Sequence, residues 1–173
     1  MLTLPELSKI LEGVLFLSPK PVSADDIAVN LGENKERVKE AFALLGERYA
    51  DSGLELMEVA GGYELATRKE YIDHLKIFFS NLDKTRLSRA ALETAAIIAY
   101  KQPITRAEIE SIRGVNSSGV IHSLLEKNLV RITGKAEAAG RPYLFVTTPD
   151  FLRLLGINDI SELPAVDSLE KKI

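Results

Sequence analysis

Residues whose side chains could carry out acid-base or metal chemistry are few in this sequence and lie far apart. There are only two histidines, His74 and His122, and neither has a clustered acidic partner at ligand spacing. Cysteine does not occur, which excludes disulfides and thiolate chemistry. We expect both histidines to be ordinary helix residues, with metal ligation or general-base catalysis as the alternative.

Phosphate loops and paired carboxylates are not supported either. No Walker-type or Gly-x-Gly-x-x-Gly run is present, and Gly61-Gly62 is better interpreted as a hairpin turn. Asp25 and Asp26 are adjacent on an expected helix, so their side chains diverge by roughly 100°. We therefore expect no catalytic residues, no cofactor and no metal, and an enzyme is unsupported.

The segment 87–128 predicts three helices separated by two turns. Ser88 is a suitable N-cap for a helix to about Lys101, which Gln102-Pro103 ends. Thr105 to Glu108 is a capping box that begins the second helix, and Gly114 ends it. Asn116 or Ser117 caps the third helix. Two helices joined by a short turn with glycine are typical of the helix-turn-helix, and the very apolar first helix is expected to be covered on several sides.

A hairpin follows these helices. Residues 129–133 and 143–148 are rich in β-formers, and the segment between them is rich in Gly and Ala as far as Gly140. We interpret this hairpin as the wing of a winged-helix domain.

The two halves of the chain repeat one pattern at an offset of 82 residues. Pro21 and Pro103 begin matching turns, Ser23 and Thr105 are matching N-caps, and a glycine stop follows in each half. The further matched pairs are Val22 with Ile104, Asp26 with Glu108, Ile27 with Ile109, Gly32 with Gly114, Asn34 with Asn116, Val38 with Val120, Phe42 with Leu124, and, in the opening helix, Ile10, Val14 and Leu17 with Leu92, Ala96 and Ala99. The repeat predicts two copies of one fold.

The expected fold class is mainly α with small β-hairpin wings (α+β), arranged as two tandem winged-helix domains. The N-terminal domain spans 1–85, the C-terminal domain 86–158, and a short tail 159–173. The elements expected outside 87–148 are helices at 4–17, 23–31, 34–50, 69–79 and 149–155, a hairpin formed by 54–60 and 63–67 with its turn at Gly61-Gly62, a linker at 80–86, a turn at 159–163 and a frayed end over the last ten residues.

Composition places the chain among ordinary globular proteins, with 46% hydrophobic and 27% charged residues. No window resembles a signal peptide or a membrane span, so we expect a cytoplasmic protein. The formal net charge is −3. Residues 1–85 hold 10 Lys and Arg against 15 Asp and Glu, a net of −5, whereas 86–173 hold 12 against 10, a net of +2.

Nucleic-acid binding needs consideration because a helix-turn-helix often places its second helix in the major groove. In the first copy, Lys35, Arg37 and Lys39 have neighbouring glutamates Glu33, Glu36 and Glu40, as on a solvated helix face. In the second copy the helix is nearly uncharged and lacks residues that read base edges. Arg113, Arg131, Lys135 and Arg141 form at most a modest basic rim, so DNA contact is expected to be weak or indirect.

The stretches AYKQPITRAEIESIRGVNS and GRPYLFVTT, together with the opening LSKILEGVLFLSPKPVS, closely resemble segregation and condensation protein B, the accessory subunit of the bacterial condensin complex. The resemblance covers about Leu7 to Pro164. It implies tandem winged-helix domains, a homodimer formed mainly by the N-terminal domains, and binding to the kleisin subunit, segregation and condensation protein A, and through it to the SMC ATPase. The alternative is a winged-helix transcriptional regulator that binds DNA.

From this resemblance and the apolar patterns we expect the kleisin to pack on the first and third helices of the second domain, with two arginines at the rim. The expected contact residues are Ile97, Tyr100, Ile121, Leu125, Arg113 and Arg141. For dimerisation the expected residues are Leu7, Leu11 and Leu15 on the first helix and Tyr63 on the wing. Burial in an ordinary winged-helix core is the alternative for each of them.

Overall fold

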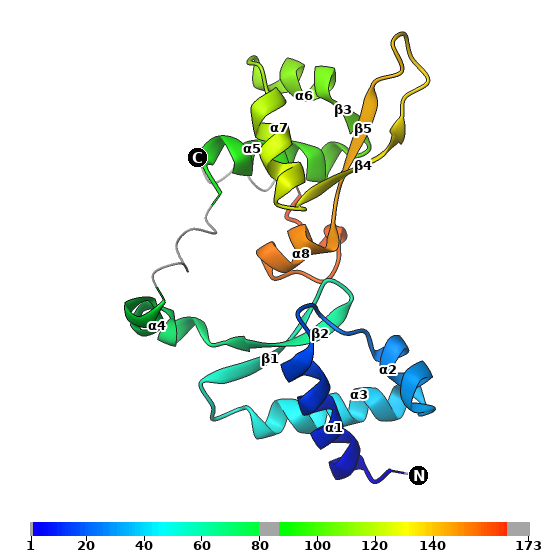
Figure 1. Ribbon diagram of the computed structural model, residues 1–173, viewed down its shortest axis with the longest axis vertical. Helices are drawn as coiled ribbons and strands as arrows, with labels where there is room; N and C mark the ends of the chain where they lie inside the picture. The colour runs from blue at the N-terminus through cyan, green and yellow to red at the C-terminus, as the bar shows by residue number, and fades with distance from the viewer. Residues whose placement is uncertain (1, 80–86, 166–173) are drawn as a thin grey trace. The chain divides into compact units, whose positions relative to one another are not determined.

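The computed structural model describes residues 2–79 and 87–165 (Figure 1). The chain divides into two compact units, Met1–Lys84, here called unit 1, and Thr85–Ile173, called unit 2. The predicted linker at 80–86 and most of the predicted frayed end lie outside the described residues. No helix in 2–79 or 87–165 is long and apolar enough to cross a membrane.

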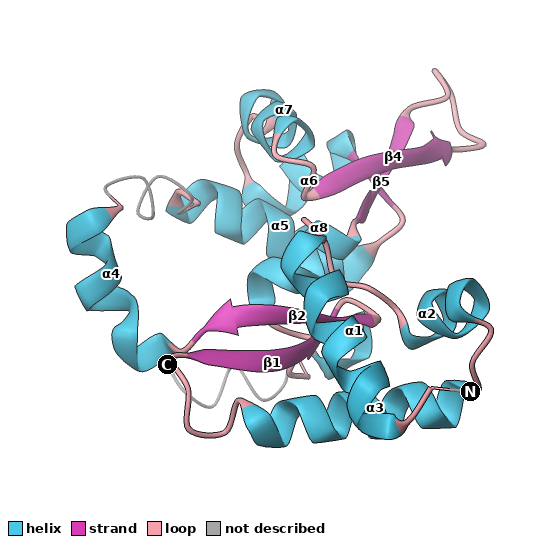
Figure 2. Cartoon of the chain, turned by 60° about the horizontal axis from the view of Figure 1, so that its bottom comes forward, coloured by secondary structure: helices cyan, strands magenta, loops and turns pink. Residues whose placement is uncertain are grey.

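Unit 1 consists of three helices, a hairpin and a further short helix. The helices are α1 (Leu4–Leu17), α2 (Ala24–Leu31) and α3 (Lys35–Arg48), the hairpin strands are β1 (Leu54–Val59) and β2 (Gly62–Thr67), and η1 (Lys69–Tyr71) leads into α4 (Ile72–Phe78). Figure 2 shows α1 crossing α3, with the hairpin beside them. Side chains of Thr3, Ser23 and Asn34 cap the three helices, and Gly32 ends α2 in the left-handed conformation.

The core of unit 1 lies between the three helices and is covered by the hairpin. Phe42 of α3 stacks on Tyr63 of β2, with ring centroids 3.9 Å apart. The buried residues of this core are Leu7, Leu11, Leu15, Ala24, Ile27, Val38, Ala41, Phe42 and Leu45.

The hairpin turn of unit 1 differs in detail from the prediction. Positive φ angles occur at Ala60 and Gly61, not at Gly61 and Gly62. Gly62 is needed for another reason, since a Cβ there would lie 2.9 Å from the backbone carbon of Val22. Val22 and Tyr63 exchange two backbone hydrogen bonds of 2.9 Å at this point, so β2 passes directly against the segment before α2.

Unit 2 repeats this plan with a three-stranded sheet. It contains α5 (Arg89–Lys101), β3 (Ile104–Thr105), α6 (Arg106–Arg113), α7 (Ser118–Glu126), β4 (Val130–Lys135), β5 (Tyr143–Thr147), α8 (Pro149–Leu155) and η3 (Ile160–Glu162). The strand order is β3-β5-β4, and all pairs are antiparallel. The core combines α5, α6 and α7 with the sheet and α8; its buried residues are Ala91, Ala95, Ile98, Ala99, Ile104, Ile109, Ile121, Leu124, Leu129, Val130, Phe145 and Phe151.

The internal repeat is visible in the strand pairing. Ile104 pairs with Phe145 in unit 2, and Val22 pairs with Tyr63 in unit 1, so both partners are shifted by 82 residues. Each unit therefore has the helix-turn-helix followed by a hairpin that defines a winged helix, and the predicted fold class is confirmed.

The alignment of the opening helices was wrong by two residues. The buried residues Leu7, Leu11 and Leu15 of α1 correspond to Ala91, Ala95 and Ala99 of α5, at an offset of 84. The reason is that six residues connect α1 to α2, whereas four connect α5 to α6. The face that the offset of 82 brings together is not the core face, because Leu92 and Ala96 are exposed.

Candidate functional site

The two histidines lie on different helices, one in each unit. His74 lies on α4, and His122 lies on α7 with its Nε2 3.3 Å from a carboxylate oxygen of Glu126. Within residues 2–79 and 87–165 no three His, Asp or Glu side chains gather in a way that could hold a metal ion.

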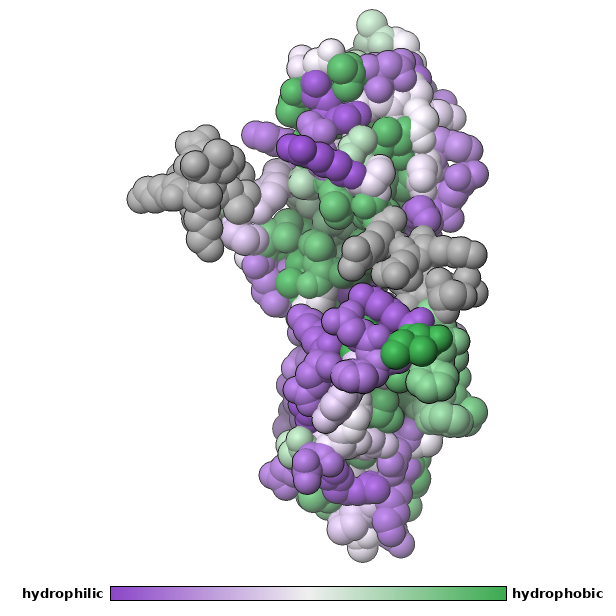
Figure 3. Space-filling view, turned by 90° about the vertical axis from the view of Figure 1, so that its left-hand side faces the viewer, coloured by the Kyte–Doolittle hydropathy of each residue, from purple (hydrophilic) through white to green (hydrophobic). Residues whose placement is uncertain are grey.

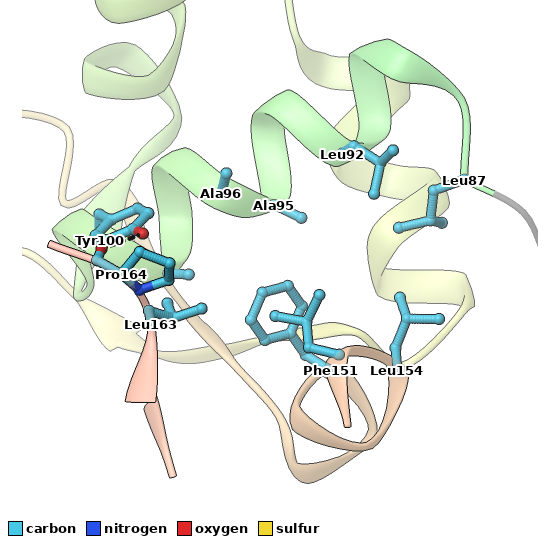
Figure 4. Close-up of a pocket in the computed structure, with 11 residues that line it drawn as sticks. Leu87, Leu92, Ala95, Ala96, Tyr100, Phe151, Leu154, Leu163 and Pro164 are labelled. Atoms are coloured by element: carbon cyan, nitrogen blue, oxygen red, sulfur yellow. Dashed lines mark hydrogen bonds between the residues drawn. The ribbon is translucent and has the colours of Figure 1, made fainter. Parts of the chain in front are cut away.

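The most prominent feature of unit 2 is an apolar groove between α5 and α8, with a volume of about 310 Å³ (Figure 4). We call it the α5–α8 groove. Figure 3 shows apolar surface gathered on unit 2 among hydrophilic residues. The residues that line the groove are Leu87, Leu92, Ala95, Ala96, Ala99, Tyr100, Phe151, Leu154, Leu155, Leu163 and Pro164.

Local sequence explains why α8 forms one wall. Thr148 caps the helix by accepting a hydrogen bond from the Phe151 amide, Pro149 occupies its first turn, and Gly156 ends it with a φ of 68°. Phe151 is buried in the core and anchors α8. Leu154 and Leu155 follow Phe151 at i+3 and i+4, so they lie on the same side of α8 and line the groove with it, where they remain 45% and 42% exposed.

The opposite wall is formed by α5. Leu92 is half exposed, and the small side chains of Ala95, Ala96 and Ala99 make the surface beside it concave. At the far end the Tyr100 hydroxyl donates a hydrogen bond of 2.6 Å to the Pro164 carbonyl, which holds the segment after η3 against α5. As predicted, α5 is covered on several sides, since α6, α7 and β5 contact it, and the remaining side of the helix faces the groove.

Of the six residues predicted to contact the kleisin, only Tyr100 lines this groove. Ile97 and Leu125 are half-buried and pack against the core of unit 2. Ile121 is 3% exposed and is a core residue, so the prediction of a surface contact is wrong there. The prediction had placed the contact on α5 and α7, but the hydrophobic face of α7 is used for packing inside unit 2.

The two predicted rim arginines are also separated from the groove residues. The side chain of Arg113 is only 7% exposed; it contacts a carboxylate oxygen of Glu93 at 3.3 Å and donates to the hydroxyl of Ser117 at 2.9 Å. Because these partners engage most of the Arg113 guanidinium, the residue offers little surface for the predicted rim contact. Arg141 is exposed, but it lies in the tip of the β4–β5 hairpin.

Of the four predicted dimerisation residues, the three leucines of α1 are buried. Leu7, Leu11 and Leu15 are 0%, 0% and 5% exposed, because they form the helical face that packs on α3. Tyr63 is half-buried through its stacking on Phe42. The large apolar side chains that unit 1 does expose were missed: Phe16, Leu17, Val29, Leu31, Leu54, Tyr71, Ile77, Phe78 and Phe79.

The helices that correspond to DNA-recognition helices carry no free cationic array. Arg37 pairs with Glu33 as predicted, at 3.2 Å. Lys35 pairs with Asp25 of α2 at 2.7 Å, which corrects the expectation of a partner on its own helix, and this hydrogen bond raises the pKa of Lys35. On α7 the charged side chain is Glu126, paired with His122.

Comparison with known proteins agrees with this arrangement. A family model described as segregation and condensation complex subunit ScpB matches residues 9–166. The chain belongs to the ScpB family. The segregation and condensation proteins B of Syntrophotalea carbinolica and Moorella thermoacetica are each 45% identical to it, over 93% and 92% of this chain and 82% of each relative.

Two solved ScpB structures are also similar. The crystal structure of ScpB from Mycobacterium tuberculosis is 34% identical, covers 91% of this chain and 99% of that one, and gives a TM-score of 0.44. A crystal structure of the dimer of an ScpB N-terminal domain complexed with an ScpA peptide is 28% identical, covers 41% of this chain and 91% of that one, and gives a TM-score of 0.39.

The family model and the two relatives confirm the predicted family. As an ScpB protein, the chain is a non-enzymatic condensin subunit that acts in chromosome segregation. The alternative of a transcriptional regulator is set aside, in agreement with the lack of Lys and Arg on α7.

Proposed function

We propose that this chain forms a homodimer through unit 1 and binds the kleisin subunit, ScpA, through the α5–α8 groove of unit 2. Through ScpA it would join the SMC ATPase, in the cytoplasm and at the nucleoid, without a cofactor. In this proposal the N-terminal domain, 1–85, serves dimerisation. The kleisin-binding domain extends past the predicted boundary at 158, because Leu163 and Pro164 line the groove.

The observation that carries the kleisin contact is the groove itself. Leucines stand on both of its walls, beside the small alanines of α5 and the ring of Phe151 on α8. An amphipathic helix with apolar residues at i, i+3 or i+4 and i+7 would place them between these walls, as in other helix-in-groove complexes. Covering Leu92, Leu154 and Leu155 would remove from water the large apolar side chains that unit 2 leaves exposed here.

For the dimer, the supporting observation is the apolar end of α4. Ile77 and Phe78 are 78% and 79% exposed, and α4 has no buried residue. Phe16 and Leu17 at the end of α1 are similarly exposed. Exposed side chains of this size favour a protein interface, so we assign the dimer contact to these residues in place of the buried leucines of α1.

The kleisin contact is tested by charged substitutions in the groove. Leu92→Glu and Leu154→Glu change one exposed position on each wall, and Ile112→Glu, on the exposed face of α6, is the matched control outside the groove. We expect the groove variants to bind ScpA at least roughly ten-fold more weakly in calorimetry, and the control to bind normally.

Equal ScpA affinity for the wild type and both groove variants would overturn this site. Unit 1 is the competing location, since the ScpA peptide of the solved relative is in a complex with its N-terminal domain. A loss of ScpA affinity in Phe78→Glu, with none in the groove variants, would place the contact there.

The dimer is tested by light scattering. The wild type is expected near twice 19.1 kDa, and the mass should survive high salt because the interface is apolar. Phe78→Glu should give a monomer, whereas Val29→Glu, an equally exposed position on α2, should remain a dimer. A monomeric wild type, or a dimeric Phe78→Glu variant at micromolar concentration, would contradict the assignment.

A further inference from the structure

The β4–β5 hairpin of unit 2 carries a basic surface that the proposed kleisin and dimer contacts do not use. We call residues 130–147 the unit 2 wing. It contains three cations, Arg131, Lys135 and Arg141, against one carboxylate, Glu137, and therefore has a net charge of +2. All three cations are exposed.

The corresponding hairpin of unit 1 has the opposite charge. Residues 54–67 contain Glu55, Glu58 and Glu64 and no Lys or Arg, a net of −3. Both hairpins are antiparallel and pair with the segment before the second helix of their unit. Because the same fold forms with either charge, packing does not require the cations of the unit 2 wing.

The wing cations also lack the acidic partners that other cations have. Among the described residues, no carboxylate oxygen lies within 4.0 Å of Arg131, Lys135 or Arg141. By contrast, Arg113, Arg106 and Lys35 are each paired with an acid. The ammonium of Lys135 lies 5.2 Å from the ring centroid of Tyr143, and this contact leaves its charge available to an anion.

The strand register distributes the cations around the hairpin. Arg131 pairs with Val146, and Lys135 pairs with Tyr143, so the two cations lie on opposite faces of the hairpin. Arg141 is in the tip, at a φ of 43°. Figure 1 shows the tip projecting beyond the helices of unit 2. A projecting ribbon with cations on both faces and at the tip fits between two rows of phosphates.

We propose that the unit 2 wing binds the phosphate backbone of double-stranded nucleic acid without reading its sequence. α7 contains no Lys or Arg, so the wing makes the phosphate contact alone. Three phosphate contacts on a chain of net charge −3 give weak binding, near the weak end of the roughly 10⁻⁴ to 10⁻⁶ M expected for non-specific complexes.

The experiment measures fluorescence anisotropy of a labelled duplex of about 30 base pairs and arbitrary sequence, starting at about 50 mM salt. The logarithm of the affinity should fall with the logarithm of salt concentration with a slope of about −3. The variant Arg131→Gln, Lys135→Gln, Arg141→Gln should bind at least roughly ten-fold more weakly and lose most of this slope. Its affinity for ScpA should be unchanged, because none of these residues lines the α5–α8 groove.

The matched control removes three exposed cations from unit 1, as Lys9→Gln, Lys39→Gln, Lys69→Gln. It changes the net charge equally and should alter duplex binding by no more than about two-fold. An equal loss in the control would overturn the proposal, since bulk charge would then explain binding. Displacement of the duplex by polyglutamate at equal charge concentration would overturn it as well, because the wing would then be a site for acidic polypeptide.

Discussion

Units 1 and 2 contain the same winged helix, but the helix that follows each wing is used differently. In unit 2, α8 inserts Phe151 into the core. In unit 1, α4 has no buried residue. The difference follows from the opening helices, since α5 places Ala91, Ala95 and Ala99 where α1 places three leucines. The smaller side chains fill less volume, and Phe151 occupies the space that remains.

The alanines on α5 also affect the surface of unit 2. When α8 is anchored by Phe151, its two turns bring Leu154 and Leu155 to face α5, and the groove results. In unit 1 the core is closed by leucines, so the apolar residues of α4 stay on the outside. The comparison teaches that one fold can present two kinds of apolar surface when three core side chains differ in size.

The largest expected effect tests whether the two cores are independent. Phe42→Ala removes a buried ring that stacks on Tyr63 and should destabilise unit 1 by about 3–5 kcal/mol. Hydrogen exchange should show lost protection in α3 and unchanged protection in α5, because each cluster of buried residues is confined to its own unit. The reciprocal control, Leu124→Ala, should lower protection in unit 2 alone. Loss of protection in both units from either variant would show one cooperative core.

The next prediction concerns Gly62, the residue at which β2 passes close to the backbone of Val22. Gly62→Ala places a methyl group 2.9 Å from backbone atoms and should cost about 1–3 kcal/mol in thermal or urea unfolding. Gly13→Ala is the control: it lies in α1 with nothing within 4 Å of its Cβ and should stabilise by about 0.5–1 kcal/mol. Equal changes in the free energy of unfolding for the two variants would show that a methyl group fits between β2 and the Val22 backbone.

A smaller difference is expected between two buried hydroxyls of the opening helices. Ser8 of α1 is buried, and its hydroxyl has no hydrogen-bond partner among residues 2–79 and 87–165. The Thr94 hydroxyl of α5, in contrast, donates a hydrogen bond of 2.8 Å to the Ala90 carbonyl. Ser8→Ala should therefore be neutral or stabilising by up to about 1 kcal/mol, and Thr94→Val should cost about 1 kcal/mol. Urea unfolding measures both; destabilisation by Ser8→Ala would indicate a partner for its hydroxyl.

The smallest effect is a pH dependence at the start of α6. Hydrogen bonds from the hydroxyl and backbone N–H of Thr105 lower the pKa of Glu108 below its ordinary value of 4.5. A lowered folded pKa means that this stabilisation is present above pH 4.5 and is lost as pH falls through the folded value. In Glu108→Gln, the free energy of unfolding should decrease less steeply as the pH falls below 4.5. Glu40→Gln, at an exposed position outside any helix cap, serves as the control. The same acid dependence in both variants would contradict this role.

The sequence was sufficient for most of the fold because helix boundaries depend on local chemistry. Ser23, Thr105 and Gly114 cap or end helices through bonds to nearby residues of the chain, and each does so where predicted. The repeat at 82 residues was visible for the same reason. It failed for α1 and α5, where the two extra residues in the connection of unit 1 carry no signal of their own.

The sequence alone also determined the family, because long matching stretches need no tertiary structure. It could not decide which apolar residues stay exposed. Leu15 and Leu17 of α1 have the same side chain, but Leu15 is buried and Leu17 is 80% exposed. Likewise, the α5–α8 groove depends on Phe151, which is distant in sequence from α5 and fills a space that alanines leave open. Exposure depends on packing between such distant segments, and only the tertiary structure decides it.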